Sequence, residues 1–127
     1  MIAVDTSALM AVLLEEREAT ACAEALADGD RIAISAVTFA EALVVAERRG
    51  LGTEMAALID GLALDVETVT LTVARRVSDV YARWGKGVDP AGLNFGDCFA
   101  YDVAKTRGCS LLYVGKDFAR TDIAGVL

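Results

Sequence analysis

Short apolar runs alternate with longer stretches of helical periodicity along the whole of this 127-residue chain. The short runs have the length of buried strands, and the longer stretches repeat their apolar residues with the spacing of helices. The strands that we expect span residues 1–4, 32–34, 64–69 and 110–114, with 123–126 as a last short one. The helices that we expect span residues 7–15, 18–27, 36–49, 53–62, 73–84 and 95–107. This alternation predicts a three-layer α/β/α sandwich around a mostly parallel sheet of four to five strands.

The composition fits one buried sheet and no membrane span. Hydrophobic residues make up 55% of the chain and charged residues 24%, which excludes disorder and favours a sheet buried on both faces. The longest stretches without a charge, Thr6–Leu14 and Ile32–Ala40, are nine residues long, whereas a spanning helix needs about 20. No basic segment precedes the first apolar residues, so we expect no export signal. The sequence predicts a single domain over residues 1–127, located in the cytoplasm.

The absence of histidine restricts the chemistry that the chain can perform. It excludes His–Ser and His–Cys dyads, His-ligated haem and the H-E-x-x-H zinc site. The three cysteines, Cys22, Cys98 and Cys109, form no C-x-x-C pair and are interpreted as free thiols in a reducing compartment. Any enzyme here must use carboxylates, hydroxyls, Lys, Arg or a metal held by oxygen. The net charge of −7 gives no general attraction to nucleic acid.

Acidic residues follow the predicted strands at the points where these strands end. Asp5 directly follows the first strand, and Asp117 follows the strand SLLYV after a Gly-Lys turn. Glu41 and Asp97 are expected in the first turns of helices, which follow the second strand and the loop 85–92. Ligands of open parallel sheets bind at the carboxyl ends of the strands, so these acids are candidates for one shared site.

Each of these acids also has an ordinary structural explanation. Asp5 could be the N-cap of the next helix, and Asp117 could belong to an exposed turn. Thr38-Phe-Ala-Glu41 and Asn94-Phe-Gly-Asp97 both have the pattern of a capping box. Together, however, the acids lie among apolar residues, where unpaired carboxylates are costly to bury and repel one another without a cation. Oxygen ligands without His or Cys select Mg²⁺ or Mn²⁺.

Four sequence blocks, in order along the chain, carry a resemblance to a known family: IAVDTSAL, SAVTFAEAL, LNFGDCFAYDVAK and LLYVGKDFARTDI. From Met1 to about Ile123 the chain resembles the PIN-domain ribonucleases of the VapC toxin type. The resemblance implies a parallel sheet flanked by helices and an endoribonuclease that depends on Mg²⁺, with Mn²⁺ as a substitute. It also implies a homodimer that acts on RNA and is neutralised by a VapB-type antitoxin.

The resemblance places the catalytic and metal-binding acids of the family on Asp5, Glu41, Asp97 and Asp117. Asp122, five residues beyond Asp117, matches a further acid of many members and is an additional candidate metal ligand. The family hydroxyl of the first block falls on Thr6 or Ser7, where helix capping explains a hydroxyl equally well.

Two positions depart from the family pattern. Asp102 stands where a small apolar residue is usual. It lies about 140° round the helix from Asp97, so we expect it to be a solvated charge. Val114-Gly115 stands where a Thr or Ser is common before the glycine, which weakens the case for a hydroxyl ligand there.

The chemistry expected at this site is hydrolysis of an RNA phosphodiester by a metal-activated water, with Asp97 or Asp117 as proton acceptor. Basic residues that lie near the acids in the sequence, or cluster on one helix, partly offset the net charge: Arg48, Arg49, Arg75, Arg76, Arg83, Lys86, Lys116 and Arg120. Aromatic residues in such a domain are more often core or dimer surface than platforms for bases: Phe39, Trp84, Phe95 and Phe99.

Three other functions fit less well. A phosphoacceptor receiver domain needs two adjacent acids after its first strand, but Asp5 stands alone. A phosphatase of the D-x-D-x-T class needs an acid where this chain has Ser7. A catalytically silent PIN-fold scaffold would lack a core acid; none is missing, and this remains the main non-enzymatic alternative.

Overall fold

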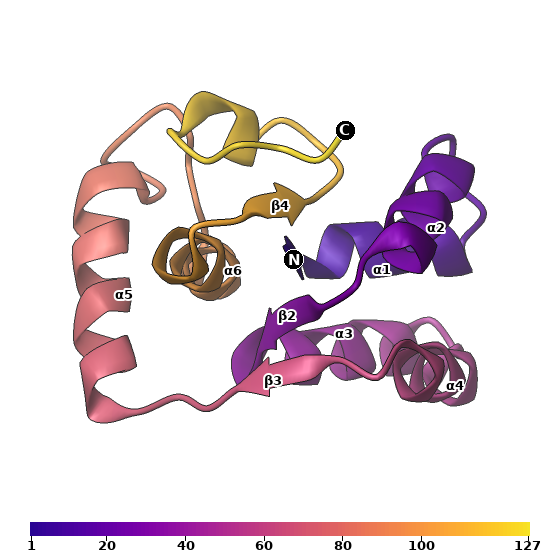
Figure 1. The fold of residues 1–127 in the computed structure, drawn as a ribbon. Helices are drawn as coiled ribbons and strands as arrows, with labels where there is room; N and C mark the ends of the chain where they lie inside the picture. Colours follow the sequence, from indigo (N-terminus) through magenta and orange to yellow (C-terminus); the bar gives the residue numbers. More distant parts are fainter.

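Four strands form the centre of the molecule, and six α-helices cover them (Figure 1). The computed structural model describes all residues from 1 to 127. The strands are β1 (Ile2–Val4), β2 (Ile32–Ser35), β3 (Asp65–Glu67) and β4 (Ser110–Leu112). The helices are α1 (Thr6–Leu13), α2 (Ala19–Asp28), α3 (Ala36–Arg48), α4 (Gly52–Leu62), α5 (Leu71–Trp84) and α6 (Phe95–Arg107). A short 3₁₀ turn, η1, spans Phe118–Arg120.

All strand pairs are parallel, and the strands lie in the order β3-β2-β1-β4. This confirms the predicted parallel sheet. The expected last strand at 123–126 contributes one bridge, between Gly125 and Leu111. The Leu111 N–H donates to the Ala124 carbonyl at 2.8 Å, and the Val126 N–H donates to the Leu111 carbonyl at 3.0 Å.

Helices lie on both sides of the sheet, as the alternation predicts. One group of buried side chains, which includes Leu9, Met55 and Leu112, joins one face of the sheet to α1–α4. The other group, which includes Phe99 and Leu111, joins the opposite face to α5 and α6. Leu111 and Leu112 belong to different groups because successive side chains of a strand point to opposite faces. Figure 1 shows α5 and α6 together on one side of the strands.

Strands lead almost directly into helices at the carboxyl edge of the sheet. Asp5 is the one residue between β1 and α1, and Ser35 both ends β2 and caps α3. The Ser35 hydroxyl accepts the Val37 N–H at 3.1 Å. Gly96, in the first turn of α6, packs against the Glu41 carboxylate of α3. The beginnings of α3 and α6 therefore meet beside the end of β1.

The capping box predicted at Thr38-Phe-Ala-Glu41 is wrong. Because Ser35 caps α3 and the helix begins at Ala36, Glu41 lies in the second turn instead of the first. Its carboxylate is consequently not bound to the amides of its own helix, and it accepts a hydrogen bond from Thr6. The corresponding pattern Asn94-Phe-Gly-Asp97 does form a capping box, at the start of α6.

The prediction that Asp102 is a solvated charge is also wrong. Asp102 is 3% exposed and faces Arg76 of α5. The Arg76 guanidinium donates Nε to Oδ1 at 2.9 Å and Nη2 to Oδ2 at 3.1 Å. The side of α6 that turns away from the sheet is covered by α5, so an acid on that side meets a partner helix instead of water.

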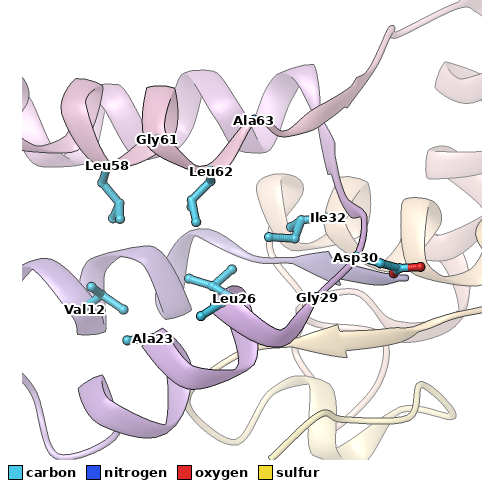
Figure 2. A pocket seen from close by; sticks show the side chains of 11 residues that line it. Val12, Ala23, Leu26, Gly29, Asp30, Ile32, Leu58, Gly61, Leu62 and Ala63 are labelled. Atoms are coloured by element: carbon cyan, nitrogen blue, oxygen red, sulfur yellow. The ribbon is translucent and has the colours of Figure 1, made fainter.

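An apolar cavity of about 480 Å³ lies between α1, α2 and α4 (Figure 2). The side chains of Val12, Leu26, Leu58 and Leu62 line it, and Gly29-Asp30 lies where the chain passes from α2 to β2. The cavity therefore lies toward the start of β2, at the opposite end of the sheet from Asp5. None of the helices combines the length and hydropathy that a membrane span requires.

Candidate active site

Asp5 lies at the end of β1 and is 4% exposed. Its Oδ2 accepts the Ser7 N–H at 3.1 Å and the Ser7 hydroxyl at 2.6 Å, so it is the N-cap of α1. Its Oδ1 is buried and has no hydrogen-bond partner. Burial raises the pKa of Asp5 and the charge of Glu41 raises it further, whereas the hydrogen bonds from Ser7 lower it. Capping explains one carboxylate oxygen and leaves the other without a role.

The Ser7 hydroxyl links Asp5 to the segment that follows β4. Its Oγ donates to Asp5 and accepts the Val114 N–H at 3.0 Å. Val114 is separated from Asp117 only by Gly115-Lys116. This hydroxyl therefore fixes the strand end that carries Asp117 relative to Asp5, across most of the sequence.

Glu41 is held by the neighbouring hydroxyl, Thr6. The Thr6 Oγ1 donates to Glu41 Oε1 at 2.6 Å. The other carboxylate oxygen, Oε2, lies so close to Gly96 that a Cβ at this position would collide with it. The resemblance placed a family hydroxyl on Thr6 or Ser7. In the structure both hydroxyls donate to an acid, Thr6 to Glu41 and Ser7 to Asp5. The requirement for glycine at position 96 was not predicted, since only the packing of α6 on α3 creates it.

Asp97 occupies the third position of α6, in a capping box with Asn94. Its Oδ2 accepts the Asn94 N–H at 3.0 Å, and the Asn94 Oδ1 accepts the Asp97 N–H at 2.9 Å. The pKa of Asp97 is nevertheless raised to about 6, chiefly by burial and further by the charges of Asp5, Asp117 and Glu41. A carboxylate in an ordinary cap is stabilised as an anion. Here the surrounding acids and the burial outweigh that effect.

Asp117 lies in the turn between β4 and η1 and is exposed. It makes no side-chain capping bond to η1, so capping does not account for it. Its charge is one of the three that raise the pKa of Asp97. The structure therefore brings Asp117 into the electrostatic environment of Asp97.

Asp122 has different neighbours from the other acids. Its Oδ1 accepts the Tyr101 hydroxyl at 2.5 Å, and its Oδ2 accepts the Lys105 ammonium at 2.9 Å. These two hydrogen bonds lower its pKa. Asp122 is not among the charges that act on Asp97, so the structure does not group it with Asp5, Glu41, Asp97 and Asp117.

The four grouped acids fit a hard divalent cation in the kind of donors that they offer. All the donors are carboxylate oxygens, the ligands that Mg²⁺ and Mn²⁺ prefer. The buried, unpaired Oδ1 of Asp5 is an atom that a cation would satisfy. No three His, Cys, Asp or Glu side chains converge closely enough to hold a metal ion in the geometry shown. The metal ligands therefore stay a prediction.

The PIN domain family matches the chain over residues 2–124, and the chain belongs to this family. Ribonuclease VapC28 of Mycobacterium tuberculosis is 39% identical to it over 128 residues, which cover 98% of this chain and 96% of the relative. Within the PIN domain family, the chain therefore belongs with the VapC ribonucleases.

Solved structures share the fold at lower sequence identity. The crystal structure of Mycobacterium tuberculosis VapC20, described as a sarcin-ricin loop cleaving toxin, has a TM-score of 0.78 at 20% identity and covers 99% of this chain and 98% of that chain. VapBC2 from Rickettsia felis, crystallised with a DNA fragment from its promoter, has a TM-score of 0.70 at 15% identity, with 98% and 96% covered. These likenesses concern the fold.

Proposed function

We propose that this chain is a metal-dependent endoribonuclease toxin of the VapC type, which hydrolyses RNA phosphodiester bonds. One observation carries the proposal: Asp5, Glu41, Asp97 and Asp117 gather where the strands end, and their mutual repulsion and burial raise the pKa of Asp97 to about 6. A relative that is 39% identical over nearly the full length is named a ribonuclease, which supports RNA as the substrate.

We expect the four acids to hold Mg²⁺, with Mn²⁺ as a substitute. Asp5 offers a buried oxygen that no protein group satisfies, which a cation would bind. The chemistry that such an ion supplies is polarisation of a phosphate oxygen and a lower pKa for an attacking water. Asp122 is retained only as a weaker candidate ligand, because Tyr101 and Lys105 already bind its carboxylate.

The residues of the chain have distinct tasks in this proposal. The proton acceptor is Asp117 or Asp97, of which Asp97 is held in a fixed geometry by its capping box. Asn94 orients Asp97 by binding Oδ2, which leaves Oδ1 free to face the substrate. Thr6 orients Glu41 and Ser7 orients Asp5, so the hydroxyls act as positioning residues.

We propose that a VapB-type antitoxin neutralises the enzyme in the cytoplasm, and that the active form is a homodimer. The Rickettsia felis VapBC2 structure supports such a partner. An arginine guanidinium of the antitoxin can form a bidentate pair with two of the acids and take the place of the cation. A silenced complex should therefore bind little metal; a complex with a fully metal-loaded, active site would contradict this mode of inhibition.

The proposal is tested by RNA cleavage with protein freed of any partner. Wild-type protein should cut structured RNA with Mg²⁺ or Mn²⁺ and stop when EDTA is added. Asp5→Asn and Asp97→Asn should lower the rate by at least ~100-fold, as expected when a metal ligand or proton acceptor is lost. Asp60→Asn, which removes an exposed acid from α4, is the matched control. Near wild-type cleavage by both site variants would contradict the assignment of these acids, and binding of RNA without cleavage by wild type would favour the silent scaffold.

A further inference from the structure

A second hollow lies beside the acid group, between α5 and the start of α6. Its volume is about 580 Å³, and its lining includes Val77, Tyr81, Lys86, Asn94, Phe95 and Cys98. Asn94 lines this hollow and also forms the capping box with Asp97. Asn94 therefore connects the hollow to Asp97, although no step proposed above uses the other lining residues of the hollow.

An exposed aromatic ring forms one wall of the hollow. Phe95 is 69% exposed, while its neighbour Phe99 is only 5% exposed. The two rings meet edge to face, with centroids 5.0 Å apart and planes at 66°. Phe99 thus anchors Phe95 from the core side and leaves much of its ring uncovered. Phe95 is not a core residue, and an anchored ring of this kind is a suitable surface for stacking.

Polar groups without protein partners surround this ring. None of the ion pairs in the structure includes Lys86, and no hydrogen bond within the protein uses the Asn94 NH₂ group. The loop that carries Lys86 is fixed, because the Tyr81 hydroxyl donates to the Lys86 carbonyl at 2.8 Å and the Lys86 N–H donates to the Leu93 carbonyl at 2.9 Å. The hollow thus combines an aromatic face, an amide donor and an ammonium group.

We propose that this hollow holds one unpaired base of the RNA substrate, stacked on Phe95, with the adjoining phosphate at Lys86. The inference rests on the proposed ribonuclease function and adds a binding determinant to it. Proteins recognise single-stranded RNA by stacking bases on aromatic rings and by contacting base edges and phosphates with polar and basic side chains. The hollow offers all three kinds of group, and one of its lining residues, Asn94, is hydrogen-bonded to Asp97.

A second copy of the chain is the other occupant that an exposed ring suggests. Such an interface does not account for the free Asn94 NH₂ group or the unpaired Lys86 ammonium. RNA supplies a partner for each: an acceptor on a base edge for Asn94 and a phosphate for Lys86. The capping box of Asn94 with Asp97 also favours the substrate, because it places one lining residue of the hollow beside a proposed reacting group.

The test is equilibrium binding of a fluorescein-labelled, single-stranded RNA 8-mer of mixed sequence, measured in EDTA. The parent protein carries Asp97→Asn, which lowers the negative charge of the site and prevents cleavage. Adding Phe95→Ala should weaken binding about 5- to 100-fold, the loss expected when a base no longer stacks on an aromatic ring. Phe95→Trp should stay near the parent affinity. Leu127→Ala, an exposed apolar change at the opposite end of β1, should have no effect. Thermal unfolding confirms that each variant folds.

Two further measurements sharpen the result. A series of RNAs, each lacking the base of one nucleotide, identifies the nucleotide that stacks on Phe95. Loss of that base should weaken binding to the parent protein and leave binding to the Phe95→Ala variant unchanged. Lys86→Gln should reduce the dependence of log Kd on log salt by about one counterion. Unchanged RNA affinity of the Phe95→Ala variant would overturn the inference. A Phe95→Ala variant that sediments as a monomer but keeps its RNA affinity per chain would overturn it as well. Cleavage by wild-type protein is measured separately, so failure of the base site is distinguishable from failure of the ribonuclease proposal.

Discussion

The Thr6 hydroxyl donates to Glu41 Oε1 at 2.6 Å and thereby joins the first residue of α1 to the second turn of α3. Thr6→Val removes this donor with little change of shape. We expect the free energy of unfolding to fall by about 1–3 kcal/mol, the usual worth of a hydrogen bond to a charged group. We expect RNA cleavage to slow by about 10- to 100-fold, because residues that orient ligands have effects of this size. Thr6→Ser should recover most of both. A Thr6→Val enzyme as fast as wild type would mean that Glu41 needs no positioning.

Gly96 offers a variant that separates activity from stability. A Cβ at this position would collide with Glu41 Oε2, which is the end of a flexible side chain. Gly96→Ala should therefore displace the carboxylate and slow cleavage, but cost less stability than Thr6→Val, since Ala is the better helix former by up to about 1 kcal/mol. Cleavage kinetics and urea unfolding of the same preparation decide the matter. A variant that loses stability but keeps its activity would contradict this description of the site.

Asp97 should make the metal-free protein less stable as the pH rises. Folding raises its pKa from 3.8 to about 6, so between these values the folded state holds a proton that the unfolded chain has lost. Stability should then fall as the pH increases from about 4 to about 6 and stay lower above that range. Asp97→Asn, which can still accept the Asn94 N–H, should remove the part of this fall that Asp97 contributes and leave the part due to Asp5, whose pKa is also raised. At pH 8 it should be more stable than wild type by roughly 1–2 kcal/mol after allowance for screening, or a few degrees in Tm.

The measurement is urea unfolding in EDTA between pH 4 and pH 8, with Asp60→Asn as the control. If Asp97 were only a helix cap, its loss would instead cost up to about 1 kcal/mol at neutral pH. A destabilised Asp97→Asn at pH 8 would show that capping outweighs the repulsion.

Arg76, which is partly exposed, pairs with the buried carboxylate of Asp102, and disruption of this pair should be costly. Arg76→Ala leaves Asp102, which is 3% exposed, without a partner. We expect a loss of about 3–5 kcal/mol in unfolding free energy, the usual effect of leaving a buried charge unpaired. The double variant Arg76→Met with Asp102→Leu should recover most of that loss, because an apolar pair can replace a buried ion pair. Chemical unfolding of the three proteins tests this. A small effect of Arg76→Ala would mean that water reaches Asp102.

The sheet could be predicted from the sequence because short apolar runs and helical periods mark strands and helices locally. The adjacency of the strand ends that precede Asp5 and Asp117 could be predicted as well, since β1 and β4 are neighbours in a parallel sheet. The contact between Thr6 and Glu41 could not, because it joins two helices, and periodicity within each helix does not show which of their side chains meet. The burial of Asp102 depends on α5 covering α6, and periodicity within one helix does not reveal which sides of it a neighbouring helix covers.

Binding of Mn²⁺ tests the central claim, that Asp5, Glu41, Asp97 and Asp117 form one metal site. Electron paramagnetic resonance counts free and bound Mn²⁺ in purified, partner-free protein at pH 7.5. Wild type and Asp60→Asn should bind the ion with the same affinity. Asp5→Asn and Asp97→Asn should each weaken it at least ~10-fold, because each removes a charged ligand from the group. Binding that is unchanged in both variants, or absent from wild type, would show that these four acids are not a metal site.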